Sequence, residues 1–252
     1  IISIGLFKSN LIFLNHFLGD TNAEIENKLA NYLRDIQEDH GGWPLYHGGD
    51  FNMSASVKAY FALKLCGDDE NSPDMTRARD IIIKNGGASK SNVFTRITLA
   101  LFEQVPWRAI PVMRPEALLL PSWAPFHIYK VAYWSRTVMV PLFILAALKP
   151  KAKNPKNINI DELFVRPPFE EENYLVNPTG HWLGELFLKI DKLAKRFEHL
   201  FPKKLENAGI KKAMCFIKER LNGEEGLGAI FPAMANALMA FDALGYSKND
   251  SD

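Results

Sequence analysis

Residues 33–43 read LRDIQEDHGGW and place a glutamine, a glycine and a tryptophan at the end of a predicted helix. Apolar residues recur at helical spacing up to this stretch, so Gln37 is expected in the last turn. Gly41 can adopt a conformation that ends a helix, which allows Trp43 to fold back beside the Gln37 amide. We expect the amide to hydrogen-bond free backbone groups of neighbouring helix ends while it stacks on the indole. The alternative is a helix that ends in an exposed glutamine and is followed by an ordinary core tryptophan.

The rest of the chain reads as helices separated by glycine and proline turns. Thr21 and Glu24 have the spacing of a capping box, and Ser54 and Asp74 are candidate starts of two further helices. The Cys66–Gly67 pair is typical of a helix end. No segment alternates apolar and polar residues as a strand does, so the sequence predicts an all-α fold. We expect helices near residues 22–38, 54–66, 74–85, 91–103, 129–148, 181–199, 207–221 and 232–245.

A weak internal repeat indicates how these helices pair. Residues 59–63 (AYFAL) and 240–244 (AFDAL) share the pattern Ala-aromatic-x-Ala-Leu, and each copy follows a glycine-rich turn. The second copy lacks the glutamine and the tryptophan, since Leu221 and Leu227 stand in their places. Repeated helix hairpins must stack to bury their apolar faces, either in a solenoid or in a closed barrel of paired helices. Periodicity alone does not choose between these two arrangements.

Composition sets limits on the class of protein. The chain has 252 residues, of which 47% are hydrophobic and 12% aromatic, enough apolar material for one large helical domain. Its 30 basic and 29 acidic residues give a net charge of +1, which does not favour a nucleic-acid partner. The two cysteines, Cys66 and Cys215, lie in apolar helical contexts. We therefore expect buried free thiols in a reducing compartment rather than a disulfide.

Neither the start of the chain nor its most apolar run has the features of a targeting or membrane-spanning segment. Residues 1–18 contain Lys8 and Asn10 and lack a small-residue cleavage site, so we expect no signal peptide. The absence of an initiating methionine suggests a truncated N-terminus. The apolar run 138–148 is too short to span a bilayer and is expected as a buried or interfacial helix. Residues 149–180 are expected as one long irregular connection, a solvated loop that could also lie against anionic lipid.

Metal and cofactor sites are not indicated by the sequence. The histidines show neither an HExxH pattern nor paired spacing, and the two cysteines do not form a CxxC pair. No glycine-rich phosphate loop or nucleophile elbow is present. We therefore expect no metal and no cofactor. The histidines considered are His40, His47, His127, His181 and His199.

Four blocks of the sequence, at residues 37–65, 86–107, 130–150 and 221–245, resemble the N-terminal half of bacterial squalene-hopene cyclases. In that family the Gln37–Gly41–Trp43 element is called the QW motif. The resemblance implies a closed alpha-alpha barrel, or toroid, of helix hairpins. It also implies that residues 1–252 form a single domain, truncated at both ends, that corresponds to the inserted second barrel of a two-barrel enzyme.

The same resemblance implies an activity. These enzymes are isomerases, with related hydro-lyase activity, that convert squalene to hopene and hopanol by proton-initiated cationic cyclisation. Their acid is an Asp-x-Asp-Asp cluster in the other barrel, and the acidic groups at residues 68–70, 161–162 and 250–252 do not match it. Because these groups lie in polar, loop-like settings, we expect solvated surface carboxylates. No catalytic residue is therefore expected in this chain, and the isolated chain is expected to be inactive.

What the resemblance does imply here is a cavity wall. Aromatic faces stabilise a cation without offering a nucleophile. Trp134 and Phe94 match aromatic residues that line the squalene pocket in the family, and Ile230, Phe231 and Pro232 match a wall segment near the terminal cation. The alternative for each is plain core packing. This chain departs from the better-known pattern at four positions, which puts the final deprotonation in doubt: Lys58 replaces a glutamate, Asn92 an arginine, Thr98 a tryptophan and Phe231 a glutamine.

The implied partners are squalene or a similar polyisoprenoid, the second cyclase barrel and a membrane surface. The resemblance places the full-length protein on the cytoplasmic side of the bacterial cytoplasmic membrane, in a peripheral or monotopic position. A second hypothesis is a non-catalytic helical-repeat protein whose barrel binds an isoprenoid or another protein.

Overall fold

The computed structural model describes residues 4–124, 127–177, 180–221, 223 and 226–247. Within these residues the chain forms α-helices joined by turns and short 3₁₀-helices, and the one β-type pairing is an isolated antiparallel bridge between Leu221 and Leu227. The predicted all-α fold is therefore confirmed. The α-helices are α1 (Ile4–Leu18), α2 (Ala23–Asp35), α3 (Met53–Cys66), α4 (Pro73–Lys84), α5 (Val93–Leu101), α6 (Tyr133–Leu148), α7 (Trp182–Arg196), α8 (Lys203–Lys218) and α9 (Phe231–Ala243).

The chain divides into two compact units. The first unit comprises Ile1–Ile110 and Lys151–Tyr174, and the second comprises Pro111–Pro150 and Leu175–Asp252. Each unit is built from helices that pack side by side, which is the element from which an alpha-alpha barrel is made. Among the described residues no helix has both the length and the apolar character needed to cross a bilayer.

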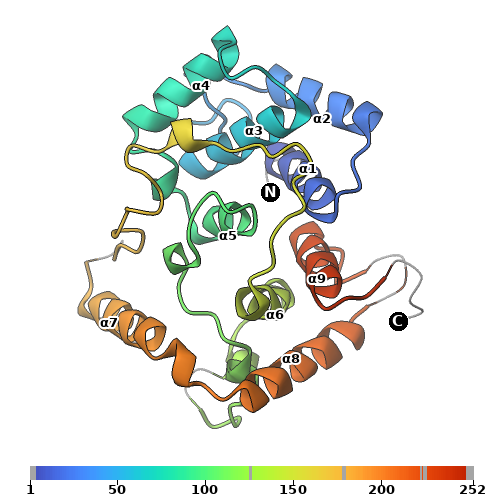
Figure 1. The fold of residues 1–252 in the computed structure, drawn as a ribbon, viewed down its shortest axis with the longest axis vertical. Coiled ribbons are helices and arrows are strands. Elements are labelled where there is room, and N and C mark those ends of the chain that lie inside the picture. Colours follow the sequence, from blue (N-terminus) through green and yellow to red (C-terminus); the bar gives the residue numbers. More distant parts are fainter. Residues whose placement is uncertain (1–3, 125–126, 178–179, 222, 224–225, 248–252) are drawn as a thin grey trace. The chain divides into compact units, whose positions relative to one another are not determined.

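In the first unit, α3 lies against α1, α2 and α4 (Figure 1). Nearly every side chain of α3 is buried, because neighbouring helices cover it on several sides. Phe61 is fully buried, and its ring centroid lies 5.3 Å from those of both Phe13 and Phe102. Burial of each such ring stabilises the fold by about 2–3 kcal/mol. Residues 59–63 (AYFAL), the first copy of the internal repeat, therefore lie at the centre of this core.

Helix α1 was not among the helices expected from the sequence. Its buried apolar side chains, Ile12, Phe13, Leu14 and Phe17, are nearly consecutive and do not follow a single amphipathic stripe. A helix that is covered on more than one side loses the 3.6-residue polar period on which sequence patterns depend.

The predicted starts of α2 and α3 need correction by one or two residues. Asn22, not Thr21, caps α2, and its side-chain oxygen accepts hydrogen bonds from the backbone N–H groups of Glu24 and Ile25. Asn52, not Ser54, caps α3 by accepting from a backbone N–H group of its first turn. An asparagine at this position satisfies free N–H groups at least as well as a serine or threonine does.

Proline explains where α4 begins, and glycine explains where α3 ends. Helix α4 begins at Pro73, with Ser72 as its N-cap, so Asp74 lies inside the first turn. The predicted end of α3 at Gly67 is confirmed, because Gly67 has φ +110° and its N–H bonds back to the helix.

In the second unit, α6 packs against α9 and α8, and α8 packs against η3 (Pro115–Leu119). The side chains of residues 140–145 are buried, so the central part of the apolar run 138–148, expected as a buried or interfacial helix, is buried within its unit. Gly209 allows the close approach of α8 to η3, because a Cβ atom there would lie 2.5 Å from the Pro115 carbonyl carbon. The expected 129–148 helix begins only at Tyr133, since η4 (Ile128–Lys130) forms a separate turn before it.

Two expectations about burial are wrong. Cys215 is exposed and Cys66 is half-buried, although both thiols are free. Cys215 lies on the outer side of α8, whose buried face is formed by neighbours such as Met214 and Phe216. Residues 149–180 have no described α-helix, as predicted, but they are not simply a solvated loop. The apolar side chains of Ala152, Ile160, Leu163 and Tyr174 are buried and hold this connection to the first unit.

Candidate functional site

The turn from Gln37 to Trp43 joins three helices of the first unit. Helix α2 ends at Asp35, so Gln37 follows the last turn rather than lying within it. Its amide nitrogen donates to the carbonyl of Gly41 at 2.7 Å and to the carbonyl of Asp74, in α4, at 3.0 Å. The amide therefore connects the end of one helix to the first turn of another.

The Trp43 indole is buried at 2% exposure and closes the C-terminal end of α2. Its Nε1–H donates to the Leu33 carbonyl at 2.7 Å, one of the last carbonyls of that helix. Its backbone N–H donates to the Ser56 hydroxyl in α3 at 2.9 Å. Gly41 is needed in this turn because its φ is +87° and a Cβ atom would lie 3.0 Å from the Arg77 carbonyl oxygen.

The turn before α9, the helix that carries the second copy of the internal repeat, is closed by backbone pairing. Leu221 and Leu227 have the same six-residue spacing as Gln37 and Trp43, and they form the antiparallel bridge before α9. Leu227 is fully buried, so it fills core space as Trp43 does. Neither leucine has a side-chain N–H group, and backbone pairing closes the turn instead.

Trp134 and Phe94 are exposed within their own units. Trp134, near the start of α6 in the second unit, is 64% exposed, and Phe94, near the start of α5 in the first unit, is 55% exposed. A threonine hydroxyl further along the helix donates to the backbone carbonyl of each, from Thr137 to Trp134 and from Thr98 to Phe94. These exposures argue against the alternative of plain core packing for both rings.

Ile230, Phe231 and Pro232 lie together at the start of α9 in the second unit. Ile230 is the extended N-cap residue, and Pro232 occupies the first turn, where a proline is tolerated because its missing N–H would have no helical partner. All three side chains are half-buried. The segment is therefore partly accessible.

The expectation of solvated carboxylates is partly wrong, because Asp68, Glu70 and Glu162 are paired with basic side chains; Glu70 Oε2 lies 2.5 Å from Lys64 Nζ. Asp68 accepts two hydrogen bonds from the Arg34 guanidinium, at 2.6 and 2.9 Å. Glu162 accepts from the Tyr60 hydroxyl at 2.9 Å and from Lys64 Nζ at 2.6 Å. Each carboxylate is thus compensated by a positive partner, which does not suit a proton donor. Residues 250–252 lie outside the described residues.

Lys58, named above only as a departure from the family pattern, is a buried amine. It is 8% exposed, and its Nζ donates to Asn10 Oδ1 in α1 at 2.9 Å. Burial lowers the pKa of Lys58 to about 8, because a charged ammonium loses its hydration there. The sequence could have indicated this contact only if α1 had been recognised.

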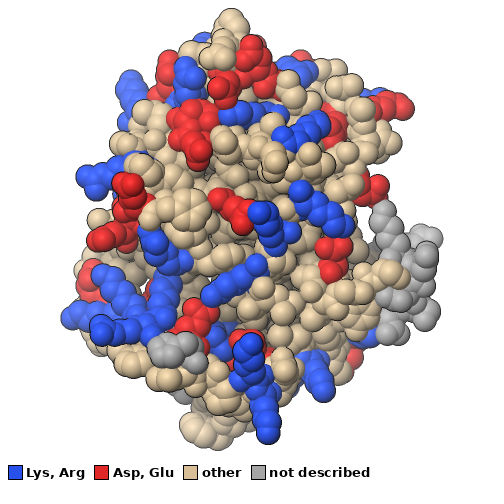
Figure 2. Space-filling model, in the orientation of Figure 1, with Lys and Arg blue, Asp and Glu red and all other residues tan. Residues whose placement is uncertain are grey.

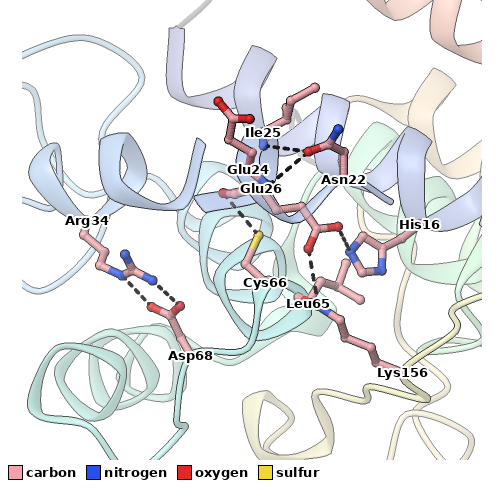
Figure 3. Close-up of polar contacts among 10 residues, drawn as sticks. All are labelled: His16, Asn22, Glu24, Ile25, Glu26, Arg34, Leu65, Cys66, Asp68 and Lys156. Atoms are coloured by element: carbon pink, nitrogen blue, oxygen red, sulfur yellow. Dashed lines mark hydrogen bonds and ion pairs between the residues drawn. The ribbon is translucent and has the colours of Figure 1, made fainter. Parts of the chain in front are cut away.

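A second buried polar cluster, at His16, Glu26 and Lys156, was missed by the sequence analysis (Figure 3). His16 Nε2 lies 2.8 Å from Glu26 Oε1, and Lys156 Nζ lies 3.3 Å from the other carboxylate oxygen. Lys156 Nζ also donates to the Leu65 carbonyl at 2.8 Å. Burial lowers the pKa of His16 and outweighs the opposing effect of Glu26. The cluster links α1, α2 and α3 to the irregular connection of residues 149–180.

A wide apolar surface runs along α7 in the second unit. No side chain of α7 is buried, and its large apolar side chains recur at helical spacing on one side. Charged side chains lie on the rest of its surface: Glu185 and Asp191, and lysine or arginine at positions 189, 192, 195 and 196. We call this surface the α7 apolar face; it consists of Leu183, Leu186, Phe187, Ile190, Leu193 and Phe197, which are 40–58% exposed.

Charges of both signs lie on the face of the molecule that Figure 2 shows. Figure 2 shows Lys and Arg side chains interspersed with Asp and Glu over the face in view. Among the residues that the structure describes, no group of three or more His, Cys, Asp or Glu side chains is arranged to hold a metal ion.

Comparison with known proteins identifies the family of this chain. Residues 5–252 match the family model described as the squalene-hopene cyclase N-terminal domain. The chain is 52% identical over 241 residues to a squalene–hopene cyclase of Bradyrhizobium diazoefficiens and 49% identical over 244 residues to one of Zymomonas mobilis; each match covers 94% of this chain and 36% of the relative. A dammaradiene synthase of Dryopteris crassirhizoma is 31% identical, over 96% of this chain and 35% of its own length. The chain thus spans little more than a third of these relatives, and it belongs to the squalene-hopene cyclase N-terminal domain family.

Proposed function

We propose that residues 1–252 form the inserted barrel of a squalene-hopene cyclase, a triterpene cyclase of hopanoid biosynthesis, and supply part of the wall of its substrate cavity. The observation that carries this proposal is the 64% exposure of Trp134 in a chain of this family. A tryptophan that is not packed in the core of its own unit is available to a cavity that the rest of a longer polypeptide completes. Phe94, Ile230, Phe231 and Pro232 contribute to the same wall.

The chemistry of cyclisation explains why such a wall is apolar and aromatic. A proton adds to a terminal double bond of squalene, the positive charge moves along the carbon chain as rings form, and a proton is finally lost or water is captured. The faces of Trp134 and Phe94 stabilise the moving cation through their quadrupoles and offer it no nucleophile. We assign the proton donor to the rest of the polypeptide, since Asp68 and Glu162 are paired with cations.

The α7 apolar face supports a proposal about location. An amphipathic helix with exposed apolar side chains and flanking lysines suits the boundary between lipid headgroups and acyl chains. We infer that the protein binds peripherally or monotopically to the cytoplasmic side of the bacterial cytoplasmic membrane, where it takes up squalene from the lipid.

The test uses the full-length enzyme and a matched pair of tryptophans. Trp134→Ala should shift the products from squalene toward incompletely cyclised hydrocarbons, because the cation loses its aromatic stabilisation. Trp123→Ala is the control, since Trp123 is 80% exposed and is not assigned to the wall. Gas chromatography and mass spectrometry measure the products. Unchanged products and rate in Trp134→Ala, or no conversion of squalene by the parent enzyme, would refute the proposed function.

A further inference from the structure

Four side chains in the second unit form a stack at the start of α6. The His127 and Tyr129 rings are stacked, with centroids 5.3 Å apart. The Arg136 guanidinium lies over Tyr129 at 4.9 Å and near Tyr133 at 5.6 Å, measured to the ring centroids. Tyr129 and Tyr133 are 56% and 50% exposed, so the stack faces the surface of its unit. We call these four residues the Arg136 stack.

The Arg136 charge has no counter-ion in the described part of the chain. Its Nε–H is buried and has no hydrogen-bond partner there, and no carboxylate pairs with the guanidinium. Arg114 in the same unit offers a contrast, because it is surrounded by Glu116, Glu198 and Glu206. The two tyrosine rings orient the Arg136 guanidinium, but they do not neutralise it.

The position of Arg136 on its helix makes a negative partner more favourable still. Arg136 lies in the first turn of α6, at the positive end of the helix dipole. That turn has no acidic residue, and its N-cap residue, Ala132, offers no capping side chain. An anion beside the guanidinium is therefore also favoured by the positive end of the helix dipole.

We propose that the Arg136 stack is a socket for a carboxylate side chain from the part of the polypeptide that lies outside residues 1–252. This inference rests on the proposed function, because it assumes the longer polypeptide that the relatives have, of which this chain spans about 36%. Squalene has no anionic group and cannot fill the socket.

Photocrosslinking in the full-length, membrane-bound protein identifies the occupant. Tyr133→p-benzoylphenylalanine keeps an aromatic side chain and places a crosslinker beside Arg136. Peptide mass spectrometry should find adducts on a segment beyond residue 252 that contains Asp or Glu. Adducts only on lipid, only on a second copy of the chain, or on a segment without an acidic residue would overturn the proposal.

Variants that change the charge at position 136 test the role of Arg136 itself. The measurement is the rate of backbone amide hydrogen exchange of residues 128–137 in the full-length, membrane-bound protein. Arg136→Gln should speed exchange roughly tenfold, since a docked carboxylate loses its partner. Arg136→Lys should retain much of the protection, and Lys130→Gln is the control for loss of one nearby charge. Equal exchange in Arg136→Gln and the parent protein would contradict the socket. Neither readout needs conversion of squalene, so a docked but inactive protein would refute the proposed function and leave this inference intact.

Discussion

At the scale of single residues, the Trp43 indole and the His16 imidazole show two ways in which a buried polar group is accommodated. The indole N–H bonds a carbonyl at the end of α2, which would otherwise be buried without a partner. His16 is fully buried beside Glu26, and its pKa is lowered because burial disfavours the imidazolium form. The first group stabilises the fold at any pH, and the second makes stability depend on pH.

Replacing Trp43 tests the first of these contacts. Trp43→Phe keeps an aromatic ring but removes the donor to the Leu33 carbonyl, so it should lower the free energy of unfolding by about 1–3 kcal/mol. Urea unfolding of the full-length protein, followed by circular dichroism, measures the change. Trp123→Phe, at an 80% exposed position, should change it little. Equal stability of the two variants would show that the indole hydrogen bond does not matter.

The His16 cluster predicts the direction of a pH effect. Because the folded pKa lies below the ordinary value of 6.5, the unfolded chain binds a proton first as pH falls. Stability should therefore decrease as pH drops from about 6.5 toward the folded pKa, and level off below it. Comparison of unfolding at several pH values in His16→Gln and in His47→Gln, an exposed control, isolates this contribution. A His16 ring that titrates above 6.5 by NMR would contradict the sign.

At the scale of elements, the sequence predicted each described α-helix except α1, including α3, which neighbouring helices cover on several sides. Helices α2 and α4 have clear amphipathic patterns and sharp ends, so their positions followed from caps and glycines. Helix α1 has buried residues all round and no such pattern. The contacts of Lys58 and of His16 depend on α1, and neither could be predicted without it.

The α7 apolar face makes an element-scale prediction. Phe187→Glu places a charge in the middle of this face and should release the full-length protein from vesicles containing anionic lipid, because a carboxylate is costly to bury among acyl chains. Sedimentation with the vesicles measures the bound fraction. Tyr46→Glu adds the same charge at a 67% exposed aromatic position of the first unit and should leave binding unchanged. Equal binding of both variants would show that α7 does not contact the membrane.

At the scale of the whole molecule, the paired carboxylates do not suit the proton donor of the proposed reaction, whereas the exposed aromatic rings suit the proposed cavity wall. The carboxylates of Asp68 and Glu162 are held by cations and do not suit the start of a cationic cascade. Trp134 and Phe94 are exposed, as the proposed wall requires. The sequence could place these rings near helix starts, but their exposure depends on which neighbours cover them. That information comes only from the folded chain.

A structure of the full-length protein with a bound, non-reacting analogue of squalene would show directly whether this chain lines the substrate cavity. The Trp134 and Phe94 rings should lie within about 4 Å of the bound hydrocarbon, as wall residues in contact with it. An analogue bound in a cavity that neither ring touches, with both rings in solvent or against lipid, would contradict this prediction.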